Sequence, residues 1–179
     1  MKRIILAAVA VSMIAAGVQA SEGSPINLSL WDPVQIVGRE ESVKGFRLNI
    51  FYTRNADVTG LDLGFIFNRT DGEFSGVQLA FANLTAGDAT GWMANFGGVV
   101  KGHFTGLQGA IWGTTVYNGA GSTNGAQIGW VNNVEGKMSG LQLGFVNLAQ
   151  SAHGVQIGLF NMISSKEKFS WLPIVNWQF

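Results

Sequence analysis

Hydrophobic and polar residues alternate along most of this chain. The pattern is clearest in residues 140–147, GLQLGFVN, and in residues 154–161, GVQIGLFN. An alternation with a period of two is typical of a β-strand with one apolar and one polar face, whereas a helix would spread both sets of residues around its axis. The chain is therefore predicted to be all-β.

The alternating segments recur as a short repeat, and each copy opens with a glycine. Repeats of this kind predict an array of one small structural unit. With one further strand near residues 26–37 and another at residues 169–179, we expect about ten short strands. The spacing of the copies is nearly constant, except for one longer interval between Gly106 and Gly125. The opening residues are Gly45, Gly60, Gly76, Gly91, Gly106, Gly125, Gly140 and Gly154.

The connections between the repeats alternate between two kinds. Those at residues 69–73 and 135–137 are short and charged, whereas those at residues 85–90 and 150–153 are polar and nearly uncharged. This alternation indicates a larger repeat of about 30 residues, which corresponds to a pair of strands. Glu135-Gly136 suits a two-residue hairpin turn, because glycine adopts a positive φ there, and such a turn would pair Trp130 with Leu141. The pattern thus predicts antiparallel hairpins.

The length of the strands favours a membrane barrel. A strand of about nine residues, tilted by about 40°, rises roughly 23 Å, close to the apolar band of an outer-membrane barrel. We expect an antiparallel up-and-down transmembrane β-barrel of about ten strands, with large apolar side chains facing lipid. Seven side chains on the polar face are predicted to face the lumen: Arg47, Asp62, Gln78, Gln108, Gln127, Gln142 and Gln156.

The alternative fold is a β-solenoid in which each coil corresponds to the larger repeat. It would place Gln and Asn outside and Leu and Phe inside. The tight turns that end in glycine suit directly paired strands better, and the longer interval between Gly106 and Gly125 would break a stacked register. The barrel is therefore the main prediction.

The N-terminus resembles an export signal. Lys2 and Arg3 precede an apolar run over residues 4–17 and small residues before Ser21, which predicts a signal peptide over residues 1–20. Residues 21–179 then form a single domain. Without Lys2 and Arg3 the chain has a net charge of −2, which offers no basic surface for nucleic acid. We expect export to the bacterial outer membrane and the cell surface.

The C-terminal strand and the repeats resemble known bacterial proteins. An alternating aromatic strand with Trp171, Trp177 and Phe179 resembles the terminal strand that the barrel-assembly machinery recognises. The tandem repeats, the opening SLWDPVQ at residues 29–35 and the ending PIVN resemble bacterial surface-repeat proteins over nearly the whole mature chain. This resemblance implies an outer-membrane barrel whose partners are lipid and the assembly machinery. It implies no active site.

Few residues carry chemistry. His103 and His153 fall in connections far apart in the chain, without convergent metal ligands. There is no nucleophile elbow or phosphate loop. We therefore predict no catalytic, metal-binding or cofactor-binding residues and no cofactor. If Leu48 pairs with Leu61, Arg47 lies opposite Asp62, and the two should form a structural ion pair, because an unpaired buried charge is costly.

Three functions are consistent with these observations. The main prediction is a small outer-membrane protein with a structural or surface-interaction role, not an enzyme, whose surface ligand is unknown. A narrow pore is an alternative, although ten strands enclose a small lumen that Gln and Asn side chains would largely fill. A secreted β-solenoid that acts as a binding module is the other.

Overall fold

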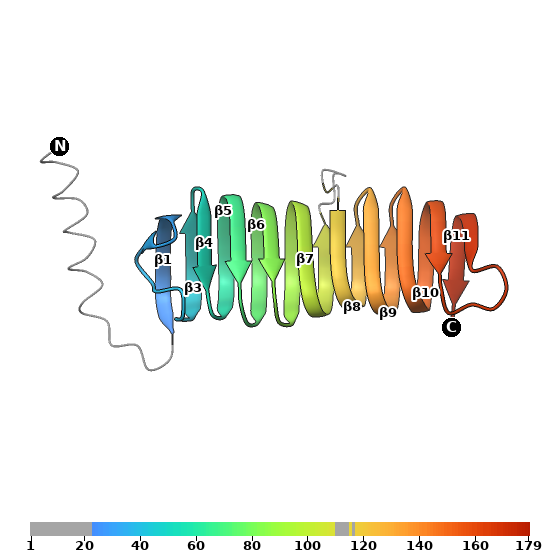
Figure 1. Ribbon diagram of the computed structural model, residues 1–179, viewed down its shortest axis with the longest axis horizontal. Coiled ribbons are helices and arrows are strands. Elements are labelled where there is room, and N and C mark those ends of the chain that lie inside the picture. Colours follow the sequence, from blue (N-terminus) through green and yellow to red (C-terminus); the bar gives the residue numbers. More distant parts are fainter. Residues whose placement is uncertain (1–22, 110–114, 116) are drawn as a thin grey trace, which may run out of the picture.

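The computed structural model describes residues 23–109, residue 115 and residues 117–179, which form one long sheet wound around an axis (Figure 1). The predicted signal peptide lies outside the described residues. The strands are β1 (Ser24–Trp31), β2 (Val34–Gln35), β3 (Val43–Asn49), β4 (Tyr52–Asn55), β5 (Val58–Thr70), β6 (Phe74–Thr85), β7 (Ala89–Gly109), β8 (Tyr117–Ile128), β9 (Val131–Leu143), β10 (Val146–Ile163) and β11 (Trp171–Gln178).

Successive repeats lie directly beside one another in parallel register. Gly45 pairs with Gly60 between β3 and β5, and Gly60 pairs with Gly76 between β5 and β6. The same column of opening glycines continues through β7, β8, β9 and β10. One copy of the short repeat is therefore one coil, and the chain forms a β-solenoid of about nine turns.

The predicted transmembrane barrel and its hairpins are wrong. Trp130 does not pair with Leu141 across a turn; Ile128 lies beside Leu143 in the next coil, in a parallel pair. The charged and the uncharged connections follow one another along the same edge, which we call the turn edge. There the N–H of Gly87 donates to Gly72 O at 3.0 Å, and that of Gly102 to Gly87 O at 3.2 Å. The glycines of these connections therefore bond to the next coil through their backbones and do not form hairpin turns.

The longer interval between Gly106 and Gly125 does not break the stack. On one side Gly97 pairs with Tyr117, and on the other Gly106 pairs with Gly125, so β7 and β8 keep the common register. The extra residues fall within 110–116, most of which lie outside the described residues. An insertion at one edge of a coil leaves the strands on either side of it free to stack.

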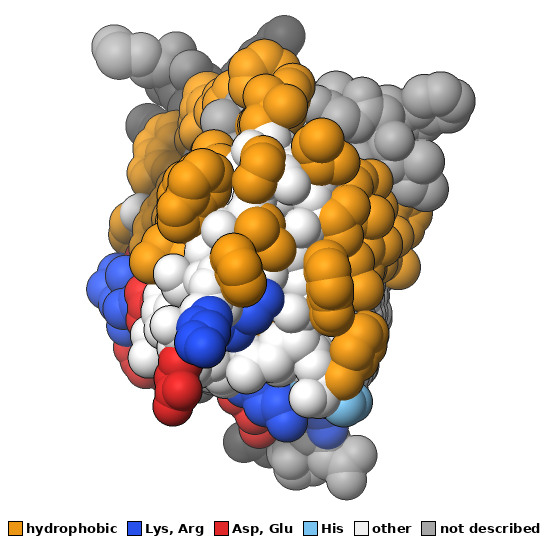
Figure 2. Space-filling view, turned by 90° about the vertical axis from the view of Figure 1, so that its right-hand side faces the viewer, with side chains coloured by type: hydrophobic (Ala, Val, Ile, Leu, Met, Phe, Trp, Pro, Cys, Tyr) orange, Lys and Arg blue, Asp and Glu red, His pale blue; other side chains and the backbone are white. Residues whose placement is uncertain are grey.

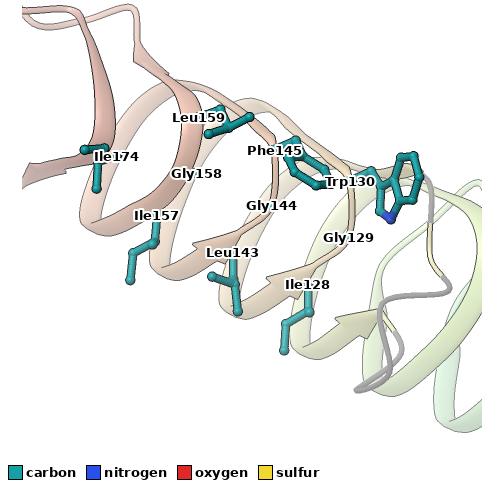
Figure 3. Close-up of a pocket in the computed structure, with 10 residues that line it drawn as sticks. All are labelled: Ile128, Gly129, Trp130, Leu143, Gly144, Phe145, Ile157, Gly158, Leu159 and Ile174. Carbon is teal, nitrogen blue, oxygen red and sulfur yellow. The ribbon is translucent and has the colours of Figure 1, made fainter.

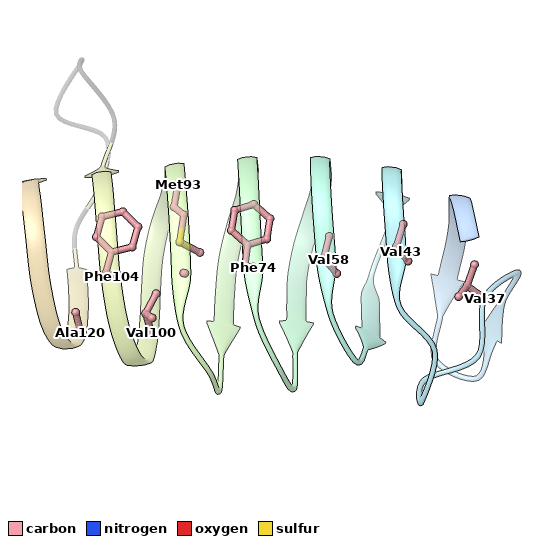
Figure 4. Close-up of a cluster of buried hydrophobic side chains, with 9 residues drawn as sticks. Val37, Val43, Val58, Phe74, Met93, Val100, Phe104 and Ala120 are labelled. Atoms are coloured by element: carbon pink, nitrogen blue, oxygen red, sulfur yellow. The ribbon is translucent and has the colours of Figure 1, made fainter. Parts of the chain in front are cut away.

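The interior near the turn edge is a hydrophobic core. Val43, Val58, Phe74, Ala89 and Phe104 are buried at equivalent places in successive coils, and the four larger side chains point into the stack (Figure 4). A second cluster, with Val134, Met138, Ala149, Ala152 and Ile163, continues the core in the C-terminal coils.

Both ends of the stack change strand direction. At the N-terminal end β2 pairs with β1 in antiparallel fashion, and at the C-terminal end β11 pairs antiparallel with β10. A strand that reverses direction interrupts the parallel template that an exposed sheet edge would otherwise offer to another chain. Trp171, Trp177 and Phe179, predicted in a barrel-assembly strand, are thus located in or beside this C-terminal cap, and all three are exposed.

Candidate functional site

The edge opposite the turns is covered with exposed hydrophobic side chains, and we call it the apolar edge. Phe65 and Leu159 there are 71% and 68% exposed. The same class of residue recurs at the equivalent place in most coils, because the alternation sends every second side chain outward. The large exposed members are Ile50, Phe51, Leu61, Phe65, Ile66, Leu79, Phe81, Trp92, Phe96, Tyr117, Trp130, Leu143, Phe145, Ile157, Leu159 and Phe160.

Hydrophobic side chains cover this edge and extend down both flanks, whereas charged side chains gather at the opposite, turn edge (Figure 2). Aromatic rings stack along the axis. The ring centroids of Phe81 and Phe96 are 4.9 Å apart, and those of Trp130 and Phe145 are 5.5 Å apart. Offset and edge-to-face pairs of this kind hold exposed rings in one orientation. The apolar surface is therefore ordered and continuous.

A shallow apolar hollow of about 480 Å³ lies in this edge near the C-terminal end. Ile128, Leu143 and Ile157 form one wall, and Trp130, Phe145 and Leu159 form the other, with three glycines between them (Figure 3). Ile174 of β11 closes its C-terminal end.

Behind the apolar edge the interior is polar. Gln142 donates from Nε2 to Gln127 Oε1 at 2.8 Å, and Gln156 donates in the same way to Gln142 at 2.7 Å. Gln127 continues the ladder to Gln108 at 2.9 Å. All four carboxamides are buried. A buried amide without a partner is costly, so a ladder in which each coil supplies the partner of the next stabilises the stack.

A second amide ladder faces the first from the opposite strand of each coil. Asn118 donates to Asn132 at 2.9 Å, Asn132 to Asn147 at 2.8 Å, and Asn147 to Asn161 at 2.7 Å. Its donors point toward the C-terminus, whereas the glutamine donors point toward the N-terminus. The side-chain dipoles of the two ladders therefore oppose each other along the axis.

The glutamine column begins with an ion pair in the N-terminal coils. Arg47 binds Asp62 with both Nε and Nη2, each at 2.7 Å from a carboxylate oxygen, and both side chains are completely buried. Gln78 donates to the same carboxylate at 2.5 Å. The expected ion pair is present, but Leu48 lies beside Leu63 rather than Leu61, because the strands are parallel.

The seven side chains expected to face a barrel lumen all point into the interior of the solenoid, where each is at most 1% exposed. They form one column, which Met93 interrupts between Gln78 and Gln108. The asparagine ladder was not among the predicted site residues. An asparagine seven positions after the opening glycine in four of the eight repeats was the pattern that could have indicated it.

The turn edge is polar and offers no convergent site among the described residues. Asp57 and Asp88 accept the backbone N–H groups of Glu73 and His103 from the next coil, each at 2.8 Å. His103 contacts Ser122 at 2.5 Å, and His153 lies against the ring of Phe179 at the far end of the stack. Within the described ranges, no group of three His, Cys, Asp or Glu side chains is placed to hold a metal ion.

Among the residues that the structure describes, no helix has the length and hydrophobicity needed to cross a membrane. No family model, no curated protein and no solved structure matches the chain.

Proposed function

We propose that this β-solenoid is a structural or surface-interaction protein that lies on a membrane with its apolar edge inserted into the lipid. One observation carries the proposal. Large hydrophobic side chains are exposed over one edge and both flanks, while the polar side chains of the same strands are buried and hydrogen-bonded inside. A protein in water alone favours the reverse arrangement.

The height of the apolar edge matches one leaflet. Phe145, at the tip, lies five positions after Gly140, and a strand of this length rises roughly 16 Å. Half of the hydrocarbon core of a bilayer is about 15 Å thick. Insertion up to the glycine column would therefore bury the hydrophobic side chains and leave the charged turn edge in water, as in a protein that lies in one face of the membrane.

The distribution of the hydrophobic side chains favours lipid over a single protein partner. Leu61 and Leu143 are exposed on one flank, Tyr117 and Phe160 on the other, and Phe145 at the tip. A protein partner would cover one face, whereas a lipid phase surrounds an edge from both sides. In the C-terminal coils the two amide ladders also supply the hydrogen bonds that buried polar side chains need in a lipid environment.

The proposed location is the bacterial outer membrane, supported by the predicted signal peptide and by the resemblance to surface-repeat proteins. The barrel-assembly machinery is not part of this proposal, because that expectation depended on a barrel. Nor is a pore, because the amide ladders and the hydrophobic core fill the interior of the described coils.

Flotation with phosphatidylcholine vesicles tests the proposal. The native chain should float with the vesicles. Phe145→Glu should lower its partition about tenfold or more, because an exposed aromatic side chain that would insert into lipid is replaced by a charge. Gln150→Glu introduces the same charge at the turn edge of the same coil and should leave flotation unchanged. A native chain that stays out of the vesicle fraction, or that forms a stable dimer in water which Phe145→Glu dissolves, would overturn the proposal.

A further inference from the structure

Two arginines lie directly beside each other on the outer surface of one flank, between the apolar edge and the turn edge. Arg54 of β4 pairs in register with Arg69 of β5. Like charges placed directly opposite in a sheet destabilise it. In the following coils the same row contains Leu84 and then Val99, so the two cations interrupt an otherwise largely apolar row.

One carboxylate holds both guanidinium groups. Asp71 accepts a hydrogen bond from Nε of Arg69 at 2.6 Å and another from Nε of Arg54. The cluster therefore has a net charge of +1. The Nη atoms of both arginines make no hydrogen bond to a described residue, and the two side chains are 30% and 38% exposed. Two partly exposed guanidinium forks are thus oriented and still have donors to offer.

The position of the pair relative to the apolar edge is also defined. Tyr52 and Phe67 precede the arginines by two positions on the same outer face, and their rings stack at 5.8 Å. Two residues of a strand span about 7 Å. Arg69 lies four positions after Phe65 at the tip, so its backbone is roughly 13 Å from the tip. If the apolar edge is inserted as proposed, this backbone lies just inside the hydrocarbon boundary, and the long arginine side chains extend from there to the lipid headgroups.

We infer that Arg54 and Arg69 form a binding site for one phosphate group, oriented by Asp71. Guanidinium forks match the geometry of phosphate oxygens and bind them with paired hydrogen bonds. A bound phosphate would also neutralise the net charge of +1 that remains after Asp71 has paired with the two arginines. The choice of a lipid headgroup as the source of the phosphate depends on the proposed membrane insertion, whereas the anion site itself does not.

The test compares neutral phosphatidylcholine vesicles with vesicles that contain one fifth phosphatidylglycerol, at about 0.1 M salt. The native chain should partition more strongly into the anionic vesicles. Arg54→Gln and Arg69→Gln should each reduce this preference roughly fivefold, the effect of one cation near an anionic surface. Lys101→Gln is the control, because Lys101 is exposed and directly precedes Gly102, which stacks on Gly87 at the turn edge. It should change the preference less than twofold.

Inorganic phosphate separates the two sources of the anion. Calorimetric binding of phosphate to the native chain in a neutral detergent, lost in Arg54→Gln, assigns the site to free phosphate as well as to lipid. A preference for anionic vesicles that millimolar phosphate does not displace assigns it to the headgroup. If the chain binds phosphate in detergent but ignores neutral vesicles, the proposed function fails and the site stands. Equal losses in Lys101→Gln and Arg54→Gln, or no preference for anionic vesicles together with no phosphate binding, would overturn the site.

Discussion

Asn95 occupies the interior space that the missing side chain of Gly98 leaves open. A Cβ atom at Gly98 would lie 2.6 Å from Asn95 Oδ1 and would also collide with Asn83. In the C-terminal coils the arrangement is the opposite: a Cβ at Gly144 would collide with the asparagine ladder at Asn132. In the coil that contains Asn95 and Gly98, asparagine and glycine have therefore exchanged strands relative to the C-terminal coils. Each of these coils has room for only one carboxamide near the apolar edge.

This exchange predicts strong coupling between residues 95 and 98. Gly98→Asn alone should destabilise the chain by about 1–3 kcal/mol, because two carboxamides then compete for one space. Asn95→Gly alone should also destabilise it, since it leaves a cavity and a flexible strand residue. The double variant restores the pattern of the other coils and should be more stable than the sum of the single effects implies, by about 1–3 kcal/mol.

Chemical denaturation followed by circular dichroism measures these differences. The carboxamide of Asn83 lies beside residue 98 and has no partner among the described residues. In the double variant it gains one. Strictly additive effects of the two substitutions would show that the exchange is not a compensating pair.

The glutamine ladder makes a second prediction. Gln142→Leu removes the hydrogen bonds from Nε2 to Gln127 and to Leu148 O, and it leaves the buried donor of Gln156 without its partner in the ladder. We expect a loss of about 2–4 kcal/mol in the free energy of unfolding, since removing one member leaves its neighbours desolvated and unpaired. Gln150→Leu makes the same chemical change at an exposed site and should change the free energy of unfolding by no more than about 0.5 kcal/mol. Similar losses in the two variants would contradict a stabilising role for the ladder.

Removal of one partner of the buried ion pair should destabilise the chain more than replacement of both partners. Asp62→Asn leaves the guanidinium of Arg47 buried without a counter-charge and should cost about 3–5 kcal/mol. Replacement of both residues, Arg47→Met with Asp62→Leu, should cost less than Asp62→Asn alone, because no uncompensated charge is left. Unfolding midpoints of the two variants test this. A double variant that is less stable than Asp62→Asn would show that the pair contributes more than mutual neutralisation.

The alternation of the sequence indicates the side that each residue faces but not the direction of the neighbouring strand. Leu143 faces outward and Gln142 inward in both a barrel and the solenoid observed here. The predicted barrel has its apolar side chains outside and its polar side chains inside, whereas the predicted solenoid has its apolar side chains inside. The structure combines the solenoid fold with apolar side chains outside, an arrangement that neither prediction contained. The interval between glycines was already the length of one coil.

The charges of the connections misled the prediction of a larger hairpin repeat. Connections such as 71–73 and 86–88 are exposed and stack through backbone atoms, so their charge has little influence on the register. The pairing of Arg47 with Asp62 was predictable, because both stand on the polar face near the equivalent place in adjacent repeats. The Arg54–Arg69 pair was not, since it depends on β4 and β5 running in parallel.

The Arg54–Asp71–Arg69 cluster should make the free energy of unfolding depend on pH. Partial burial raises the pKa of Asp71, but hydrogen bonds from Arg69 and Arg54 and their positive charges outweigh it, so that the pKa is below its ordinary value. The stabilisation is therefore present above the unfolded pKa of about 3.9 and is lost as the pH falls through the lower, folded value. The effect should be below about 1 kcal/mol, because all three side chains are partly exposed to solvent.

Asp71→Asn tests this dependence. The difference in unfolding free energy between the native chain and the variant should be largest near pH 5 and should shrink as the pH falls through the folded pKa of Asp71. In an NMR titration of the carboxyl carbon, Arg69→Gln should move the pKa of Asp71 back toward its ordinary value, because it removes one of the two hydrogen bonds and one of the two positive charges that lower it. A difference that does not vary with pH, or a pKa unchanged by Arg69→Gln, would mean that Asp71 does not hold the two guanidinium groups. The phosphate site would then lack the carboxylate that orients it.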